Sequence, residues 1–284
     1  MAYMFDPQPP IAPPPGPVRQ VPAPRWRNKR GTLTTGAGIL AVLASKLKFM
    51  LVLLKFGKVG GTFLTMLVSV GAYALIFGWG YAIGFVALLF CHEMGHVLVA
   101  RWQGVNVSAP MFVPFLGAFI SMRGLPDDSL GEAAIAAGGP VLGSVAALGS
   151  LALYGVTHQP LLLALAYFGF FLNLFNLIPM SPLDGGRILG AASRWAYVAG
   201  LPILAVIAIW HFNPFLLFIL VLGAMDAFQR FRGGAVNALY YSSISPAARW
   251  AVAGGYVLLA SLLAIAMSDT HNALQVLRSG GLVG

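Results

Sequence analysis

The chain has 284 residues, of which 58% are hydrophobic and only 9% are charged, whereas a soluble domain is typically about 25% charged. This composition excludes an ordinary soluble protein. It predicts one membrane domain, because apolar runs long enough to cross about 30 Å of hydrocarbon recur from residue 62 to residue 267. Cys91 is the single cysteine, so an intrachain disulfide and a multi-cysteine zinc site are also excluded.

The net charge of +9 is best explained by membrane topology, since Lys and Arg concentrate in cytoplasmic loops. No stretch offers a basic face with interleaved aromatic residues, so no nucleic-acid partner is expected. No segment is long and polar enough for a periplasmic PDZ domain or a nucleotide-sensing domain pair. The expected surroundings are therefore the lipid bilayer and other membrane proteins.

The first two segments of the chain differ from the remainder. Residues 1–32 hold nine prolines and several basic residues, which predicts a disordered, solvated tail. Residues 33–58 are apolar but contain four lysines, and a lysine at the bilayer centre costs about 2.5–3.5 kcal/mol. An amphipathic helix at the membrane interface is therefore expected there, and residues 59–284 are expected to form the membrane-embedded domain.

The fold class predicted for this domain is an all-α polytopic membrane protein with about seven transmembrane helices. The candidate spans are 62–78, 81–101, 130–155, 160–180, 195–211, 213–229 and 250–267.

Arginine asymmetry predicts which ends of these spans face the cytoplasm. If the N-terminal tail is cytoplasmic, the loops after the second, fourth and sixth spans are cytoplasmic too, whereas the opposite loops carry no Lys or Arg before Arg278. This distribution obeys the positive-inside rule and indicates a multi-pass cell membrane protein with a cytoplasmic N-terminal tail. The cytoplasmic arginines are Arg101, Arg123, Arg187, Arg194, Arg230, Arg232 and Arg249.

The second predicted span contains the sequence His92-Glu93-Met94-Gly95-His96. Histidines four residues apart project from the same face of a helix and can ligate one Zn²⁺ ion, while Glu93 can act as general base on the attacking water. Ionisable groups in an apolar span are costly and are functional candidates by default. A catalytic zinc site is therefore favoured over a solvent-facing polar turn of helix.

Catalytic zinc usually has three protein ligands, and three acids are candidates for the third. Glu132 is better explained as an acid at a helix N-terminus, and Asp226 as the partner of Arg230 in a helical ion pair. Asp184 is favoured, because it follows two prolines that break the helix. Broken backbone at membrane depth is tolerated only where it is buried in protein or lines a water-filled cavity.

These residues resemble the site-2 protease family of intramembrane zinc metalloproteases over roughly residues 60–190. His92-Glu93-x-Gly95-His96 matches the family's HExGH pattern, and a second family motif, N-x-x-P-x-x-x-x-D-G-G, is matched by Asn176, Pro179, Asp184, Gly185 and Gly186. The resemblance implies one zinc ion per chain, held by His92, His96 and Asp184, with Glu93 as the base. It also implies that residues 59–284 are a metalloprotease domain and that single-span membrane proteins are its substrates.

Two further segments are similar to family features that contact substrate. Residues 107–122, which include Gly117, are apolar, interrupted by prolines and too short for a span. A re-entrant or β-hairpin segment near the active site is expected, whose strand edge could capture an extended peptide; a loop that plugs the cavity is the alternative. Residues 138–144, with Gly139 and Ser144, resemble a small-residue family motif or serve close helix packing. Asn176 could hydrogen-bond the substrate backbone or a metal ligand, or it could hydrogen-bond between helices.

The sequence thus predicts peptide-bond hydrolysis in transmembrane substrates, termed regulated intramembrane proteolysis. A membrane metal-ion transporter using the same His and Asp residues is the alternative. Glu93 separates the two functions, because a transporter needs no base between its ligands.

Overall fold

The structure is a computed structural model that describes residues 57–122, 124, 126, 128–193, 195–210, 214–232 and 244–280. All of them belong to one unit, Met50–Gly284. The predicted tail, residues 1–32, and the predicted interfacial helix, residues 33–58, lie outside the described residues, except that 57 and 58 begin the first described helix.

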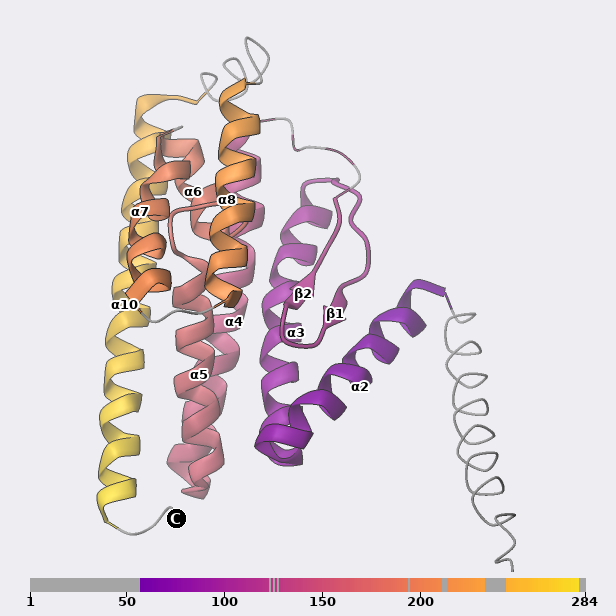
Figure 1. Ribbon diagram of the computed structural model, residues 1–284, viewed down its shortest axis with the longest axis vertical. Helices are drawn as coiled ribbons and strands as arrows, with labels where there is room; N and C mark the ends of the chain where they lie inside the picture. The colour runs from indigo at the N-terminus through magenta and orange to yellow at the C-terminus, as the bar shows by residue number, and fades with distance from the viewer. Residues whose placement is uncertain are drawn as a thin grey trace, which may run out of the picture. The chain divides into compact units, whose positions relative to one another are not determined.

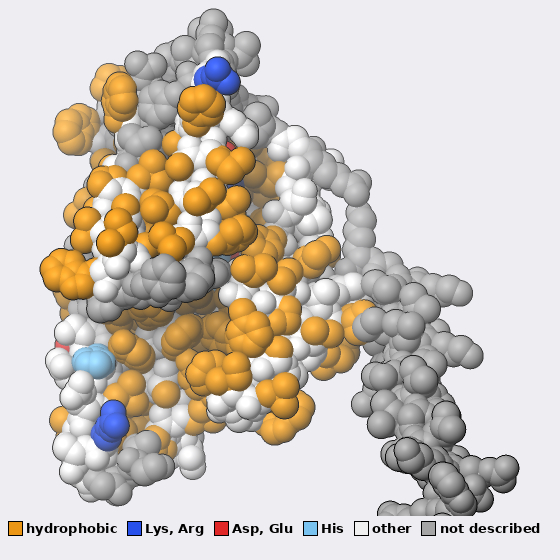
Figure 2. Space-filling model, viewed as in Figure 1, with side chains coloured by type: hydrophobic (Ala, Val, Ile, Leu, Met, Phe, Trp, Pro, Cys, Tyr) orange, Lys and Arg blue, Asp and Glu red, His pale blue; other side chains and the backbone are white. Residues whose placement is uncertain are grey.

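The described part is mostly helical and contains one small β-hairpin, as the sequence predicts (Figure 1). Hydrophobic side chains are spread over the described part of the face seen in Figure 2, where charged side chains are few, as expected for a surface in contact with lipid. In chain order the elements are α2 (Gly57–Phe77), α3 (Trp79–Trp102), β1 (Met111–Val113), β2 (Gly117–Phe119), α4 (Ser129–Thr157), α5 (Pro160–Asn176), α6 (Asp184–Ala192), α7 (Ala196–Trp210), α8 (Pro214–Arg232) and α10 (Pro246–Ser279).

Four described helices, α2, α3, α4 and α10, are long and apolar enough to cross a membrane. Each of the other three predicted spans also coincides with an apolar helix, but these helices are shorter. The 15 residues of α7 measure about 22 Å at about 1.5 Å per residue, less than the hydrocarbon thickness. In Figure 1, α7 and α8 extend over only part of the vertical range that α10 spans. The count of seven spans therefore stays a prediction.

Helices α3 and α4 approach each other closely through glycines. A Cβ atom added to Gly95 would lie 2.1 Å from the carbonyl oxygen of Gly138, and one added to Gly138 would lie 2.6 Å from the carbonyl oxygen of Gly95. Small residues permit such backbone contact, and van der Waals packing of this kind drives helix association in lipid. The helix-packing interpretation of the small-residue motif therefore holds at Gly138.

The chain between α5 and α6 is irregular, and other helices cover it. Gly200 of α7 donates its N–H to the carbonyl of Pro179 at 2.9 Å, and the hydroxyl of Tyr256 on α10 donates to the carbonyl of Leu177. Gly223 of α8 has no side chain to separate it from Ser181, whose carbonyl oxygen would lie 2.3 Å from an added Cβ. The break is thus buried in protein, which is the condition for non-helical backbone at membrane depth.

The hairpin has an antiparallel register in which Phe112 is paired with Ala118, and side chains of α2 hydrogen-bond its first strand and its turn. Thr65 accepts a hydrogen bond from the N–H of Phe112 at 3.2 Å, and the Tyr73 hydroxyl accepts one from the N–H of Phe115 at 3.0 Å. One edge of the hairpin is therefore already occupied by α2.

We predict that Gly138→Ala lowers the stability of the folded domain, because the new methyl group meets the backbone of α3. The cost of such overpacking is about 1–3 kcal/mol, measured as a lower midpoint of thermal unfolding in detergent. Gly149→Ala on the same helix is the control, since a Cβ there meets no atom of the described residues within 4 Å. Equal midpoints for the two variants would contradict the close approach of α3 and α4.

Candidate metal centre

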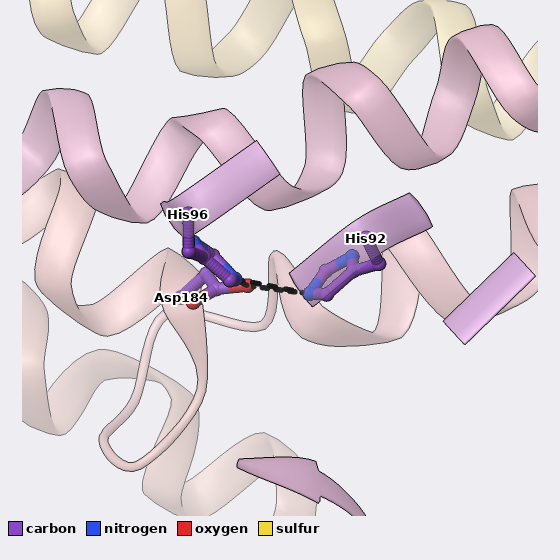
Figure 3. Close-up of side chains that lie close together, drawn as sticks. All are labelled: His92, His96 and Asp184. Carbon is purple, nitrogen blue, oxygen red and sulfur yellow. Dashed lines mark hydrogen bonds and ion pairs between the residues drawn. The ribbon is translucent and has the colours of Figure 1, made fainter. Parts of the chain in front are cut away.

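Three side chains from two elements converge at one point inside the domain (Figure 3). His92 and His96 lie one turn apart on α3, and Asp184 is the first residue of α6. The Asp184 Oδ2 atom lies 3.2 Å from Nε2 of His92 and 3.3 Å from Nε2 of His96, and the two Nε2 atoms are 3.2 Å apart. All three residues are buried.

The second nitrogen of each imidazole makes a hydrogen bond that sets its protonation. Nδ1 of His96 lies 2.8 Å from the carbonyl oxygen of Ile135, which can only accept, so Nδ1 carries the proton. Nδ1 of His92 lies 2.8 Å from Oδ1 of Asn173, and the amide orientation is fixed because Nδ2 of Asn173 donates to the carbonyl of Gly169 at 2.7 Å. In the neutral imidazoles both Nε2 atoms are therefore bare acceptors.

This arrangement fits a metal ion. Two bare nitrogens and a carboxylate oxygen repel one another at these separations, and Oδ2 of Asp184 is buried and has no hydrogen-bond donor among the described residues. Zinc ligands at about 2.0–2.1 Å in tetrahedral geometry lie about 3.3 Å apart, which agrees with the three separations. His92, His96 and Asp184 can therefore hold one metal ion, as the sequence predicts.

Glu93 is buried on α3, with 7% of its surface exposed. On an α-helix it lies about 100° around from His92 and about 60° from His96, so it flanks the face that carries the two ligands. Its predicted role as base stays a prediction.

The four residues predicted to bind substrate have different surroundings in the structure. Gly139 faces the site, because a Cβ added to it would lie 2.2 Å from Nε2 of His96. The hydroxyl of Ser144 donates to the carbonyl of Pro140 on its own helix, and Nδ2 of Asn176 donates to the carbonyl of Leu172 at 3.1 Å. Gly117 begins β2 with a φ of 99°. Their contact with substrate stays a prediction.

Sequence reasoning did not assign a role to Asn173, which holds His92. A polar amide inside an apolar helix, three residues before Asn176, was the available signal. The carbonyl of Ile135 could not be found in this way, because a backbone group carries no residue-specific signal. The sequence predicts separate roles for Glu132, as an acid at a helix N-terminus, and for Arg187, as one of the cytoplasmic arginines. The structure joins them in an ion pair, with Nε of Arg187 3.2 Å from Oε1 of Glu132.

Comparison with known proteins agrees with this site. Residues 80–160 match the model of peptidase family M50, the site-2 protease family. Rip3 of Mycobacterium tuberculosis, assigned by its name to the zinc metalloproteases, is 34% identical over 135 residues, which are 43% of this chain and 34% of that protein. The zinc metalloprotease MJ0392 of Methanocaldococcus jannaschii is 32% identical over 121 residues, 40% of this chain and 35% of that protein.

These matches confirm the resemblance to the site-2 protease family that the two motifs indicate. The aligned part spans about a third of the length of the curated relatives. Together with the four long apolar helices, the family match identifies a membrane protein.

We predict that Asn173→Leu lowers the metal affinity by about 10- to 100-fold, the usual effect of removing the partner that orients a ligating histidine. Affinity is measured by competition with a chelator on the purified protein. Asn176→Leu is the matched control on the same helix, because that amide bonds only within its own helix in the contacts described, and its affinity should equal that of the wild type. Equal affinities for both variants would contradict the role given to Asn173.

Proposed function

We propose that this chain is a zinc metalloendopeptidase that hydrolyses peptide bonds of single-span membrane proteins within or near the bilayer. The observation that carries the proposal is the convergence of two bare imidazole nitrogens and a buried carboxylate oxygen within 3.2–3.3 Å, beside Glu93, in an otherwise apolar helix. The names of the relatives support zinc as the metal and proteolysis as the reaction.

Each residue of the site has a separate role in the proposed hydrolysis. When bound, zinc would polarise the scissile carbonyl and make water acidic enough to attack near neutral pH. Asn173 and the Ile135 carbonyl keep both histidines oriented and Nδ1-protonated, so no reorientation is needed during reaction. Glu93 takes the proton of the attacking water and then gives it to the leaving amine.

The proposed site lies well inside the membrane. Trp79 and Trp102 are exposed at the two ends of α3, about 34 Å apart at 1.5 Å per residue, and exposed tryptophans mark the interfaces of a bilayer. His92 is then about 15 Å from the Trp102 end. We place that end in the cytoplasm, together with the N-terminal tail of a multi-pass protein, because the arginines cluster in the loops on that side.

The hairpin offers a place for the unwound substrate. In an antiparallel pair the N–H and C=O of one residue point to the same side. Since the Phe112 N–H points to Thr65 of α2, its partner Ala118 must direct its own N–H and C=O to the opposite edge. β2 lies next to α3, the helix with the two histidines. A substrate strand that adds to this edge would pair with Ala118 by β-augmentation.

We predict that Glu93→Gln abolishes cleavage of a membrane-protein substrate and leaves zinc stoichiometry at one per chain. The amide keeps the size of the side chain but cannot take a proton from water. Cleavage is followed on reconstituted protein, and zinc is measured by elemental analysis. Asp269→Asn, an exposed acid near the far end of α10, is the control and should keep wild-type activity.

Retained proteolysis in Glu93→Gln would contradict the mechanism. If the wild type cleaves nothing but moves zinc across vesicle membranes, and Glu93→Gln leaves this transport intact, the chain is a metal-ion transporter and the proposal is wrong.

A separate prediction concerns the open strand edge. Ala118→Pro removes the N–H that would pair with substrate, and an edge strand tolerates proline where the N–H faces outward. The loss of one main-chain hydrogen bond, worth about 0.5–1.5 kcal/mol, should lower kcat/KM about 2- to 12-fold without changing metal affinity. Ala118→Gly retains the N–H and serves as the control. Equal kcat/KM in the proline and glycine variants would rule out pairing at this residue.

A further inference from the structure

A second charged pair lies close to the metal centre and has no part in the chemistry described above. Nε of Arg187 donates to Oε1 of Glu132 at 3.2 Å, and Nη2 of Arg187 lies 3.6 Å from Sδ of Met122. Side-chain exposure is 17% for Arg187 and 4% for Glu132. The pair is therefore largely withdrawn from solvent, unlike an exposed surface ion pair.

The pair lies one helical turn from the metal centre on both sides. Arg187 follows Asp184 by three residues on α6, and Glu132 precedes Ile135 by three residues on α4. Ile135 is the residue whose carbonyl holds His96. The first two turns of α4 thus contact His96 through the backbone oxygen of Ile135 and the helix of Asp184 through the carboxylate of Glu132.

We infer that the Glu132–Arg187 ion pair positions the metal centre. It holds α6 against the first turn of α4 so that Asp184 meets His96, and it gives the Arg187 guanidinium a counter-charge. This inference rests on the proposed metal centre, and both residues are positioning residues that touch neither metal nor substrate.

Two physical reasons support a positioning role over a role in stability. Burial of an ion pair removes two charges from water, and replacement by apolar residues is often neutral or stabilising, so stability alone gives little reason for the pair. Without Glu132, the Arg187 guanidinium would still have one acid nearby, the Asp184 carboxylate one turn away on α6. Arg187 would then compete with the metal for the Asp184 carboxylate. Loss of Glu132 should therefore weaken metal binding although Glu132 is no ligand.

The test measures zinc affinity by chelator competition on the full purified chain, for Glu132→Gln, Arg187→Gln, the double variant and Arg187→Lys. Each glutamine variant should bind zinc at least tenfold more weakly than the wild type. The fold-loss of zinc affinity in the double variant should be clearly smaller than the product of the fold-losses in the two single variants, because the double variant leaves neither charge of the pair without its partner. Arg187→Lys should retain more affinity than Arg187→Gln, and Arg101→Gln, an exposed arginine on α3, should match the wild type.

Thermal unfolding of the metal-free variants separates positioning from stability. Zinc affinities within twofold of the wild type, per folded molecule, would overturn the inference even where the unfolding midpoint falls. A loss in the double variant equal to the product of the single losses would overturn it as well. A wild-type chain that binds no zinc would instead contradict the proposed function, and this inference with it.

Discussion

The proposed site depends on two hydrogen bonds made by the nitrogens that face away from the metal position. Asn173 and the Ile135 carbonyl both accept from Nδ1, which leaves both Nε2 atoms as bare acceptors next to a carboxylate. Such a cluster is costly in an apolar helix unless a cation is present. The same two hydrogen bonds join α3 to α5 and to α4. The orientation of the metal ligands therefore depends on the packing of these three helices.

The remaining architecture can be understood as support for that constraint. Glycines at the crossing of α3 and α4 bring Ile135 within reach of His96, and larger residues there would separate the helices. The broken chain that delivers Asp184 is covered by α7, α8 and α10, through contacts at Gly200, Gly223 and Tyr256. Helices α7 and α10 therefore satisfy backbone carbonyls that lipid could not, and α8 packs closely against the same segment. Helix α7, with 15 residues, is long enough to cover this segment even if it does not cross the whole bilayer.

How much the sequence predicts depends on how local the interaction is. His92 and His96 are four residues apart, so helical periodicity alone places them on one face, and the prolines before Asp184 mark a break in the helix. The hairpin at residues 107–122 is likewise confirmed. The bond between His92 and Asn173 joins residues 81 apart, and the Glu132–Arg187 pair joins residues 55 apart; both depend on helix pairing, which no local pattern specifies. The number of membrane spans likewise stays a prediction, because an apolar run of 15 residues suits either a buried helix or a short span.

X-ray absorption at the zinc edge of the purified, zinc-loaded chain tests the central claim most directly. The structure predicts a first shell of nitrogen and oxygen at about 2.0–2.2 Å, with multiple-scattering features of two imidazoles, and the loss of one imidazole in His96→Ala. A shell that contains sulfur at about 2.3 Å, or one without imidazole scattering, would contradict a metal centre made by His92, His96 and Asp184.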